Sequence, residues 1–383
     1  MDKVINVFEF FFILISLFLF SLGEGKRSHQ SRKNICLTFS LIIIFFFGFR
    51  DVGLDIEPYK IIYENYSGFE DGNVLKMFSS MLEPMHAIVI SVLKIFGIGF
   101  WCYLLIAAAM PMVIICLVVL KVDKYPILSL YFFVFAIAFP AMDAVRHFVA
   151  AGIYFGALYL LSTRRYWTYH GVTFISFLAH YSNAITLFLC PALKATWTLK
   201  SYIILLIGAF LCSVVSSELI KLMLDNLYEE GGGGPLLFKL NYYVNNTDQY
   251  EYLNNLHFWL LQVRSYFYLV FIIILNLYML SKGSLFLQGK EFHRVVLNSQ
   301  VVGTLIAVFL LGLGAREFAM RVNFLTSIGS FVLLADIVRH RGARTVIDAH
   351  KFLIVGAVLI IYNFIILLYL AGIHQPMSPF YLG

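Results

Sequence analysis

Charged residues are scarce in this chain. Asp, Glu, Lys and Arg make up only 13% of the 383 residues, whereas 61% are hydrophobic. A soluble domain carries about 25% charged residues, and a water-soluble particle of this size could not hide so many apolar side chains. We therefore expect lipid to cover much of the protein, which excludes an ordinary soluble enzyme.

Signals for metal, nucleotide or nucleic-acid binding are also lacking. The five cysteines form no CxxC pair or metal-ligand spacing, and we interpret them as small buried apolar residues. No Gly-x-Ser-x-Gly elbow, phosphate-binding loop or HExxH pair is present. The net charge of +6 comes without a basic soluble module, so anionic lipid or an anionic substrate is expected rather than nucleic acid. We expect no cofactor and no metal, since Asp55 and Glu57 are a poor carboxylate pair.

Long apolar runs, by contrast, recur from one end of the sequence to the other. A membrane-spanning helix needs roughly 20 mainly apolar residues. The runs predict an all-α polytopic integral membrane protein, a single transmembrane domain over residues 1–383, with about 11 to 13 membrane-embedded helical segments. We place them near 4–22, 34–49, 100–120, 126–142, 146–162, 167–180, 182–193, 202–222, 259–280, 295–314, 318–338 and 353–372.

The distribution of Lys and Arg predicts the orientation. Cytoplasmic loops carry an excess of basic residues, and an N-terminus outside the membrane places most of the Lys and Arg inside. Residues 4–22 are interpreted as the first span rather than a signal peptide, because no small-residue cleavage site follows. This orientation leaves two large outer loops, 50–99 and 223–258. In the first loop, residues 85–99 are predicted to form an amphipathic or re-entrant helix.

Residues 167–193 allow two interpretations, because His180, Tyr181 and Ser182 interrupt the apolar run. The segment is either one long span or a hairpin of two short helices. Loop charge favours the hairpin, since a single span would move every later basic loop to the outside.

Ionisable residues collect where the spans meet the predicted outer side, and such costly residues indicate functional sites. Arg50, Asp55 and Tyr59 follow the second span. The guanidinium of Arg50 can hold a phosphate by two hydrogen bonds, and Asp55 can orient it or accept a proton. The alternative for Arg50 is a side chain that only marks the membrane border. Glu83, which precedes Pro84, is either functional or simply the start of a helix.

Arg146 and His147 are predicted to open a helix on the same side. The free N–H groups of a helix N-terminus attract anions, so an added arginine would make a diphosphate site. The alternative is an ion pair between Asp143 and Arg146, one helical turn apart, that stabilises the turn.

Two more clusters complete this side. His180 and Ser182 occupy the helix break described above. A lone histidine is more often a satisfied structural residue, but a histidine in a helix break inside the membrane is less ordinary. Arg316 and Arg321 flank the start of a later span without sharing one helical face. The alternative for Arg321 is an ion pair with Glu317, four residues away, that has only a structural role.

Together these clusters resemble the motifs of the EpsG branch of the Wzy polysaccharide polymerases. That family typically has, in order, R-x-x-x-G-x-D-x-x-x-Y in the first outer loop, E-P before an apolar helix, R-x-x-[IVF]-A at a helix start, H-x-S, and a late arginine pair. The matching residues here are Arg50, Gly53, Asp55 and Tyr59; Glu83 and Pro84; Arg146 and Ala150; His180 and Ser182; and Arg316 and Arg321. The resemblance covers residues 45–330 by position. It departs from the family at His147, where glutamine is usual, and between Arg50 and Gly53, where two residues stand instead of three.

The resemblance implies a metal-independent glycosyltransferase of the bacterial inner (plasma) membrane, with its active site facing the periplasm or exterior. Wzy proteins join oligosaccharide repeat units carried on undecaprenyl diphosphate, building the O-antigen of lipopolysaccharide or an exopolysaccharide. The growing chain leaves its lipid diphosphate and moves onto the incoming unit. The implied partners are the lipid-linked oligosaccharide, membrane lipid and a chain-length regulator protein.

The same resemblance assigns expected roles to the clustered residues. The implied substrate contacts are Arg50, Tyr59, Arg146, His147, Ser182, Arg316 and Arg321. The base that accepts a proton from the sugar hydroxyl is expected to be Asp55, Glu83 or His180, and histidine is the commonest general base.

Other classes of protein remain open from the residues alone. One is another enzyme on the same lipid carrier, such as an O-antigen ligase or a lipid-phosphate-sugar glycosyltransferase; the latter would depend on metal. A flippase for lipid-linked oligosaccharide would carry charges along a central pathway and show repeat symmetry, whereas here the charges collect on one side. A membrane acyltransferase would need a histidine base, for which His180 is thin support.

Overall fold

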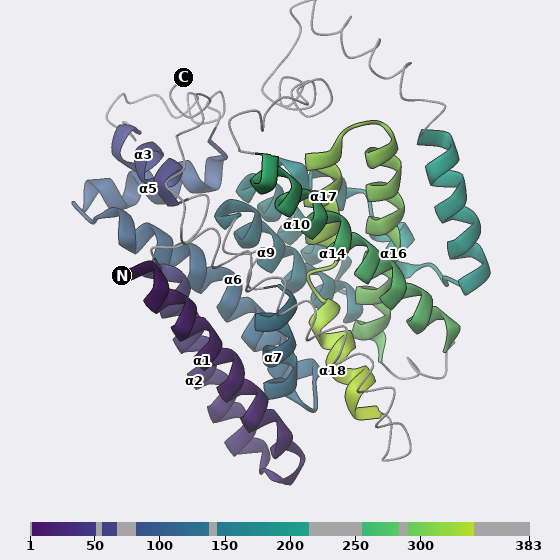
Figure 1. Ribbon diagram of the computed structural model, residues 1–383, viewed down its shortest axis with the longest axis horizontal. Helices are drawn as coiled ribbons and strands as arrows, with labels where there is room; N and C mark the ends of the chain where they lie inside the picture. The colour runs from purple at the N-terminus through teal and green to yellow at the C-terminus, as the bar shows by residue number, and fades with distance from the viewer. Residues whose placement is uncertain are drawn as a thin grey trace, which may run out of the picture. The chain divides into compact units, whose positions relative to one another are not determined.

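The computed structural model describes residues 2–50, 56–66, 82–137, 144–213, 255–282 and 290–340 (Figure 1). Within these residues the regular structure is helical and contains no strand. Four helices are long and apolar enough to cross a membrane, or five if α17 and α18 count together as one broken span. The prediction of an all-α polytopic membrane protein is confirmed. The predicted orientation stays a prediction, as do the single domain and the two outer loops.

The chain folds into two compact units. The first comprises Met1–Gly72, His86–Tyr159 and Ile328–Gly383, and the second comprises Asn73–Met85 and Leu160–Ser327. Helices of the first unit are α1 (Asp2–Leu22), α2 (His29–Gly48), α3 (Ile56–Asn65), most of α5 (Pro84–Ile95), α6 (Phe100–Val122), α7 (Pro126–Ala136), most of α9 (Val145–Ser162) and α18 (Ser330–His340). The second holds α10 (Tyr166–Ala179), the 3-10 helix η2 (Tyr181–Leu187), α11 (Cys190–Lys194), the helix Leu199–Ser213, α14 (Asn255–Ser281), α16 (Glu291–Gly312) and α17 (Arg316–Thr326).

Close helix packing in the first unit depends on glycines of α2 and α9 that face α6. A Cβ at Gly48 of α2 would lie 2.9 Å from the Cα of Leu105, and one at Gly152 of α9 would overlap Pro111. Small residues let membrane helices approach closely, and close packing matters in lipid because the hydrophobic effect does not drive helices together there. The sulfur atoms of Cys36 and Cys116 also meet there, 3.9 Å apart.

A buried carboxylate holds the start of α7. Glu24 is 0% exposed, and its carboxylate accepts hydrogen bonds from the backbone N–H groups of Ile127, at 2.8 Å, and Leu128, at 3.0 Å. The first N–H groups of a helix have no partner within it, and an anion there also meets the positive end of the helix dipole. The short connection after α1 therefore caps a helix a hundred residues away.

Polar side chains tie the second unit together around α16. Asn298 donates through Nδ2 to the carbonyl oxygens of Leu193, at 2.6 Å, and Ala195, at 2.8 Å. Thr304 meets the hydroxyl of Tyr202 at 2.9 Å. Because polar side chains inside a membrane bundle need partners, these bonds fix α16 against the short helices before it.

The predicted segment 318–338 is divided by the structure into α17 and α18. Residues Thr326 and Ser327 lie at the division, and their hydroxyls bond back to the carbonyl oxygens of Val322, at 2.8 Å, and Asn323, at 2.5 Å. Hydroxyls that compete for helix carbonyls weaken the regular ladder, and Gly329 follows. The predicted span is therefore two helices, bent by 48° at a break that the sequence analysis did not foresee.

Several other predicted boundaries changed or could not be compared. The segment 182–193 is the 3-10 helix η2 followed by the five-residue α11, and the helix predicted at 126–142 ends at Ala136. The helix predicted in 85–99 is present as α5. Residues 214–254 and 341–383 lie outside the described residues, including the predicted segment 353–372.

Candidate functional site

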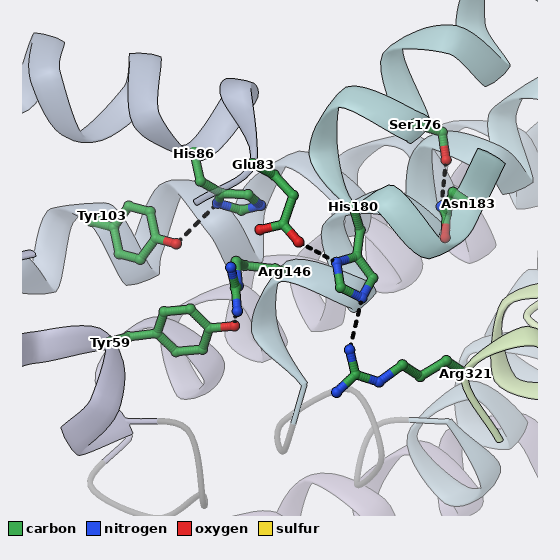
Figure 2. Close-up of polar contacts among 9 residues, drawn as sticks. All are labelled: Tyr59, Glu83, His86, Tyr103, Arg146, Ser176, His180, Asn183 and Arg321. Carbon is green, nitrogen blue, oxygen red and sulfur yellow. Dashed lines mark hydrogen bonds and ion pairs between the residues drawn. The ribbon is translucent and has the colours of Figure 1, made fainter. Parts of the chain in front are cut away.

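A carboxylate, an imidazole and a guanidinium meet in the second unit (Figure 2). Nδ1 of His180 lies 2.8 Å from Oε1 of Glu83, and Nε2 of His180 lies 3.4 Å from Nη1 of Arg321. Glu83 is 0% and His180 5% exposed. The structure therefore brings together three residues that the sequence had placed in three separate motifs.

The backbone around His180 explains how its ring is presented. His180 ends α10 in an extended conformation, with φ −159° and ψ 121°, and the 3-10 helix η2 begins at the next residue. Its carbonyl accepts from the N–H of Asn183 at 2.9 Å, and the amide of Asn183 donates to the hydroxyl of Ser176 at 2.6 Å (Figure 2). Sequence analysis missed Ser176 and Asn183, although small polar residues on each side of a histidine inside an apolar run are a usable signal.

The two ring nitrogens of His180 have different partners, and this decides their roles. A carboxylate only accepts, so the proton of the neutral imidazole belongs on Nδ1. The lone pair is then on Nε2, the atom that faces Arg321. A histidine held by a carboxylate at one nitrogen can accept a proton at the other, and the carboxylate stabilises the resulting imidazolium.

In the first unit the structure pairs Arg146 with Tyr59. Nε of Arg146 donates to the hydroxyl of Tyr59 at 2.6 Å, and the guanidinium carbon lies 5.1 Å from the centre of the tyrosine ring. Figure 2 shows both side chains, which come from α9 and α3. A guanidinium held over an aromatic ring keeps one orientation. Two motif residues 87 positions apart are thus in direct contact.

An aromatic cluster supports that pair. The rings of Tyr59 and Tyr63 both pack against Tyr103 of α6, with ring centres 6.4 and 6.1 Å away. The hydroxyl of Tyr103 lies 2.9 Å from Nδ1 of His86. Burial raises the pKa of Tyr63 above its usual value, so its hydroxyl stays protonated and donates to the carbonyl of Ile98. Neither His86 nor Tyr103 was a candidate in the sequence, because single aromatic residues in apolar helices carry no distinctive pattern.

Arg50 and His147 are both buried in the first unit. Arg50 is 3% exposed; its Nη1 donates to the carbonyl of Phe47, and its guanidinium lies 5.9 Å from the centre of the Phe47 ring. This contact satisfies a carbonyl at the end of α2. His147 is 4% exposed on α9. The substrate-binding roles of both residues stay predictions.

Arg316 and Arg321 have different neighbours in the second unit. The guanidinium carbon of Arg316 lies 5.7 Å from the centre of the Tyr266 ring on α14, whereas Arg321 meets His180. Ser182 is half-buried beside His180. Asp55, the remaining candidate base, and Asp143, the alternative partner of Arg146, lie outside the described residues.

The apolar helices define a multi-pass membrane protein, and its buried ionisable side chains lie near helix ends. The chain belongs to the EpsG family, whose model matches residues 33–381. This family points to a Wzy-like polysaccharide polymerase. No curated protein and no solved structure matches the chain.

Proposed function

We propose that this protein is a glycosyltransferase that joins undecaprenyl-diphosphate-linked oligosaccharide repeat units into O-antigen or exopolysaccharide. The contact of His180 with both Glu83 and Arg321 carries the proposal. In this proposal His180 is the proton acceptor and Arg321 is a permanent cation beside it, and a transfer of this kind needs both. The reaction would take place at the outer face of a bacterial inner membrane, with membrane lipid around it and a chain-length regulator as a further partner.

His180 is the proposed general base. As the acceptor hydroxyl of the incoming unit attacks the anomeric carbon, its proton moves to Nε2 of His180, and Glu83 stabilises the imidazolium through Nδ1–H. The bond between the anomeric carbon and the lipid diphosphate breaks, and the diphosphate leaves with the bonding electron pair. This assignment selects His180 from the candidate bases and makes Glu83 a positioning residue.

Arginines neutralise the departing diphosphate in this proposal. The attacking hydroxyl forms its new bond to the same anomeric carbon from which the phosphate departs. The base and the cation must therefore both lie within a few ångströms of that carbon. Nε2 of His180 and Nη1 of Arg321, 3.4 Å apart, meet that requirement. Fixed cations aimed at developing negative charge stabilise a transition state without a metal ion. Arg50, Arg146 and Arg316 are the other arginines proposed to contact the two lipid-linked substrates, and they need not act on the departing group.

The test is the ladder of surface polysaccharide in a deletion strain complemented with wild-type protein or with His180→Gln, at matched membrane expression. Wild type is expected to restore a long ladder, whereas His180→Gln leaves a single repeat unit on the lipid core. His170→Gln is the matched control, because His170 is exposed on the same helix. If the deletion strain loses even the single-unit band, the protein acts earlier, as a flippase or a unit-building glycosyltransferase, and the proposal fails.

A further inference from the structure

The two arginines of α17 point to different sides of the helix. Each residue of an α-helix turns by about 100°, so Arg316 and Arg321 lie about 140° apart around the axis. Their neighbours agree with this geometry, since Arg321 meets His180 of the α10–η2 break and Arg316 meets Tyr266 of α14. One phosphate cannot be clamped by both side chains in these positions.

The side of α17 that carries Arg316 also carries a buried amide. Asn323 follows Arg316 by seven residues, which brings it within about 20° of the same direction and about 10 Å along the axis. Asn323 is 0% exposed. Neither its Nδ2 nor its Oδ1 has a hydrogen-bond partner among the residues that the structure describes.

A buried side-chain amide without hydrogen-bond partners lowers the stability of the fold. Nearly all buried polar groups in native proteins have partners, and an unsatisfied one destabilises the fold. A side-chain amide offers one acceptor and two donors, which is the complement of a sugar hydroxyl. Tyr266 is 44% exposed and Arg316 is half-buried, so the Arg316 end of this face is open to a ligand, and the buried Asn323 lies about two helical turns further along the same face.

We propose that Arg316, Tyr266 and Asn323 form an acceptor subsite that binds the diphosphate and first sugar of the incoming lipid-linked unit. Arg316, oriented by the ring of Tyr266, contacts the diphosphate, and Asn323 contacts a hydroxyl of the sugar next to it. This inference rests on the proposed polymerase function and deepens it by separating the two lipid-linked substrates.

The reaction itself requires two anion sites with different positions. In the donor, the diphosphate is bonded to the carbon under attack, so its cation must lie beside the base, as Arg321 does. In the acceptor, a whole repeat unit separates the attacking hydroxyl from the diphosphate. The cation for the acceptor must therefore lie away from His180, and Arg316 is turned away from it by the helix.

The test uses the purified full-length protein and two blocked substrates made from the repeat unit of the host strain. The donor has its acceptor hydroxyl methylated, so it can only leave its lipid. The acceptor carries a phosphonate link, in which carbon replaces the glycosidic oxygen, so it can only receive. Initial rates with each substrate varied in turn yield separate KM values for donor and acceptor.

Arg316→Lys, Tyr266→Ala and Asn323→Leu are each expected to raise the acceptor KM about tenfold, the loss of one good polar contact, and to leave donor KM and kcat within about twofold. Arg321→Lys is expected to lower kcat instead. Tyr268→Phe is the control, because it removes a 2.8 Å hydrogen bond to Ser327 at the same α14–α17 contact without touching the subsite. The idea is overturned if donor and acceptor KM rise together, or if neither changes.

Thermal unfolding separates a binding role for Asn323 from a structural one. Replacing an unsatisfied buried amide with an apolar side chain of similar size is expected to keep or raise the Tm. A fall in Tm with an unchanged acceptor KM would make Asn323 structural and overturn the subsite. If the wild-type protein forms no product from the two blocked substrates, the proposed polymerase function itself fails.

Discussion

Arg146 in the first unit and Arg321 in the second both come from arginine motifs at the start of a predicted span, but their side chains have different neighbours. Arg146 donates to a phenol and lies over its ring, whereas Arg321 lies 3.4 Å from the imidazole nitrogen that carries the lone pair. A tyrosine can only orient a guanidinium under ordinary conditions, but a histidine can exchange a proton. On the proposed function, we therefore expect the first arginine to act in binding and the second in the chemical step.

The largest expected effect is on the rate of transfer when His180 is changed. Because a positioned general base contributes about 10²- to 10⁴-fold, His180→Gln should lower kcat by that range in the blocked-substrate assay. The control His170→Gln should leave kcat unchanged. A His180→Gln protein with a normal kcat would remove the contrast between the two arginines.

Glu83→Gln should lower kcat less, by about 10- to 100-fold, since the imidazole keeps a hydrogen-bond acceptor but loses the charge that stabilises its protonated form. The check is a double-mutant cycle with His180→Gln. Residues that act as a unit are strongly non-additive, so the double variant should be no slower than His180→Gln alone. Additive losses would show that Glu83 acts separately from His180.

Changes around Arg146 should affect binding before rate. Tyr59→Phe deletes the acceptor of the Arg146 Nε–H, and loss of a hydrogen bond to a charged group costs about 1.5 to 3 kcal/mol at most. We therefore expect KM for the lipid-linked substrate to rise by about 10-fold, with kcat nearly unchanged. If kcat falls as far as in Glu83→Gln, Arg146 takes part in the chemical step and the distinction fails.

The smallest effect on transfer should come from Glu24, which caps α7 and belongs to none of the motifs. Glu24→Ala leaves the N–H groups of Ile127 and Leu128 without their acceptor, at a cost of about 1 to 3 kcal/mol. Thermal unfolding in detergent should show a lower Tm with kcat per folded protein unchanged. Glu9→Ala, an exposed position on α1, is the matched control and should change neither value.

Much of the fold could be predicted because membrane insertion imposes simple length and composition rules on each segment. The run that begins at Phe100 and the run that ends at Gly312 became helices close to their predicted bounds. The break between α17 and α18 was not predicted, because hydropathy does not register the local competition of the Thr326 and Ser327 hydroxyls for helix carbonyls.

The sequence predicted the residues of the candidate site but not which of them contact one another. Glu83, His180 and Arg321 were all candidates, but the sequence offered Glu317 as the partner of Arg321 and ranked no base. The contacts join residues 97 and 141 positions apart, which no helical periodicity can connect. His86 and Asn323 were not candidates at all, because the burial of both side chains and the contact of His86 with Tyr103 arise only in the folded chain.

The sequence by itself determined that this is a helical membrane protein and where costly ionisable residues lie along it. Those properties follow from the transfer of each short segment from water to lipid, a local quantity summed over about 20 residues. Only the tertiary structure decided that His180 faces a carboxylate on one nitrogen and a guanidinium on the other, and that Arg316 turns away from it. Such choices depend on how helices pack and on which way each side chain leaves its helix, and these are properties of the whole fold.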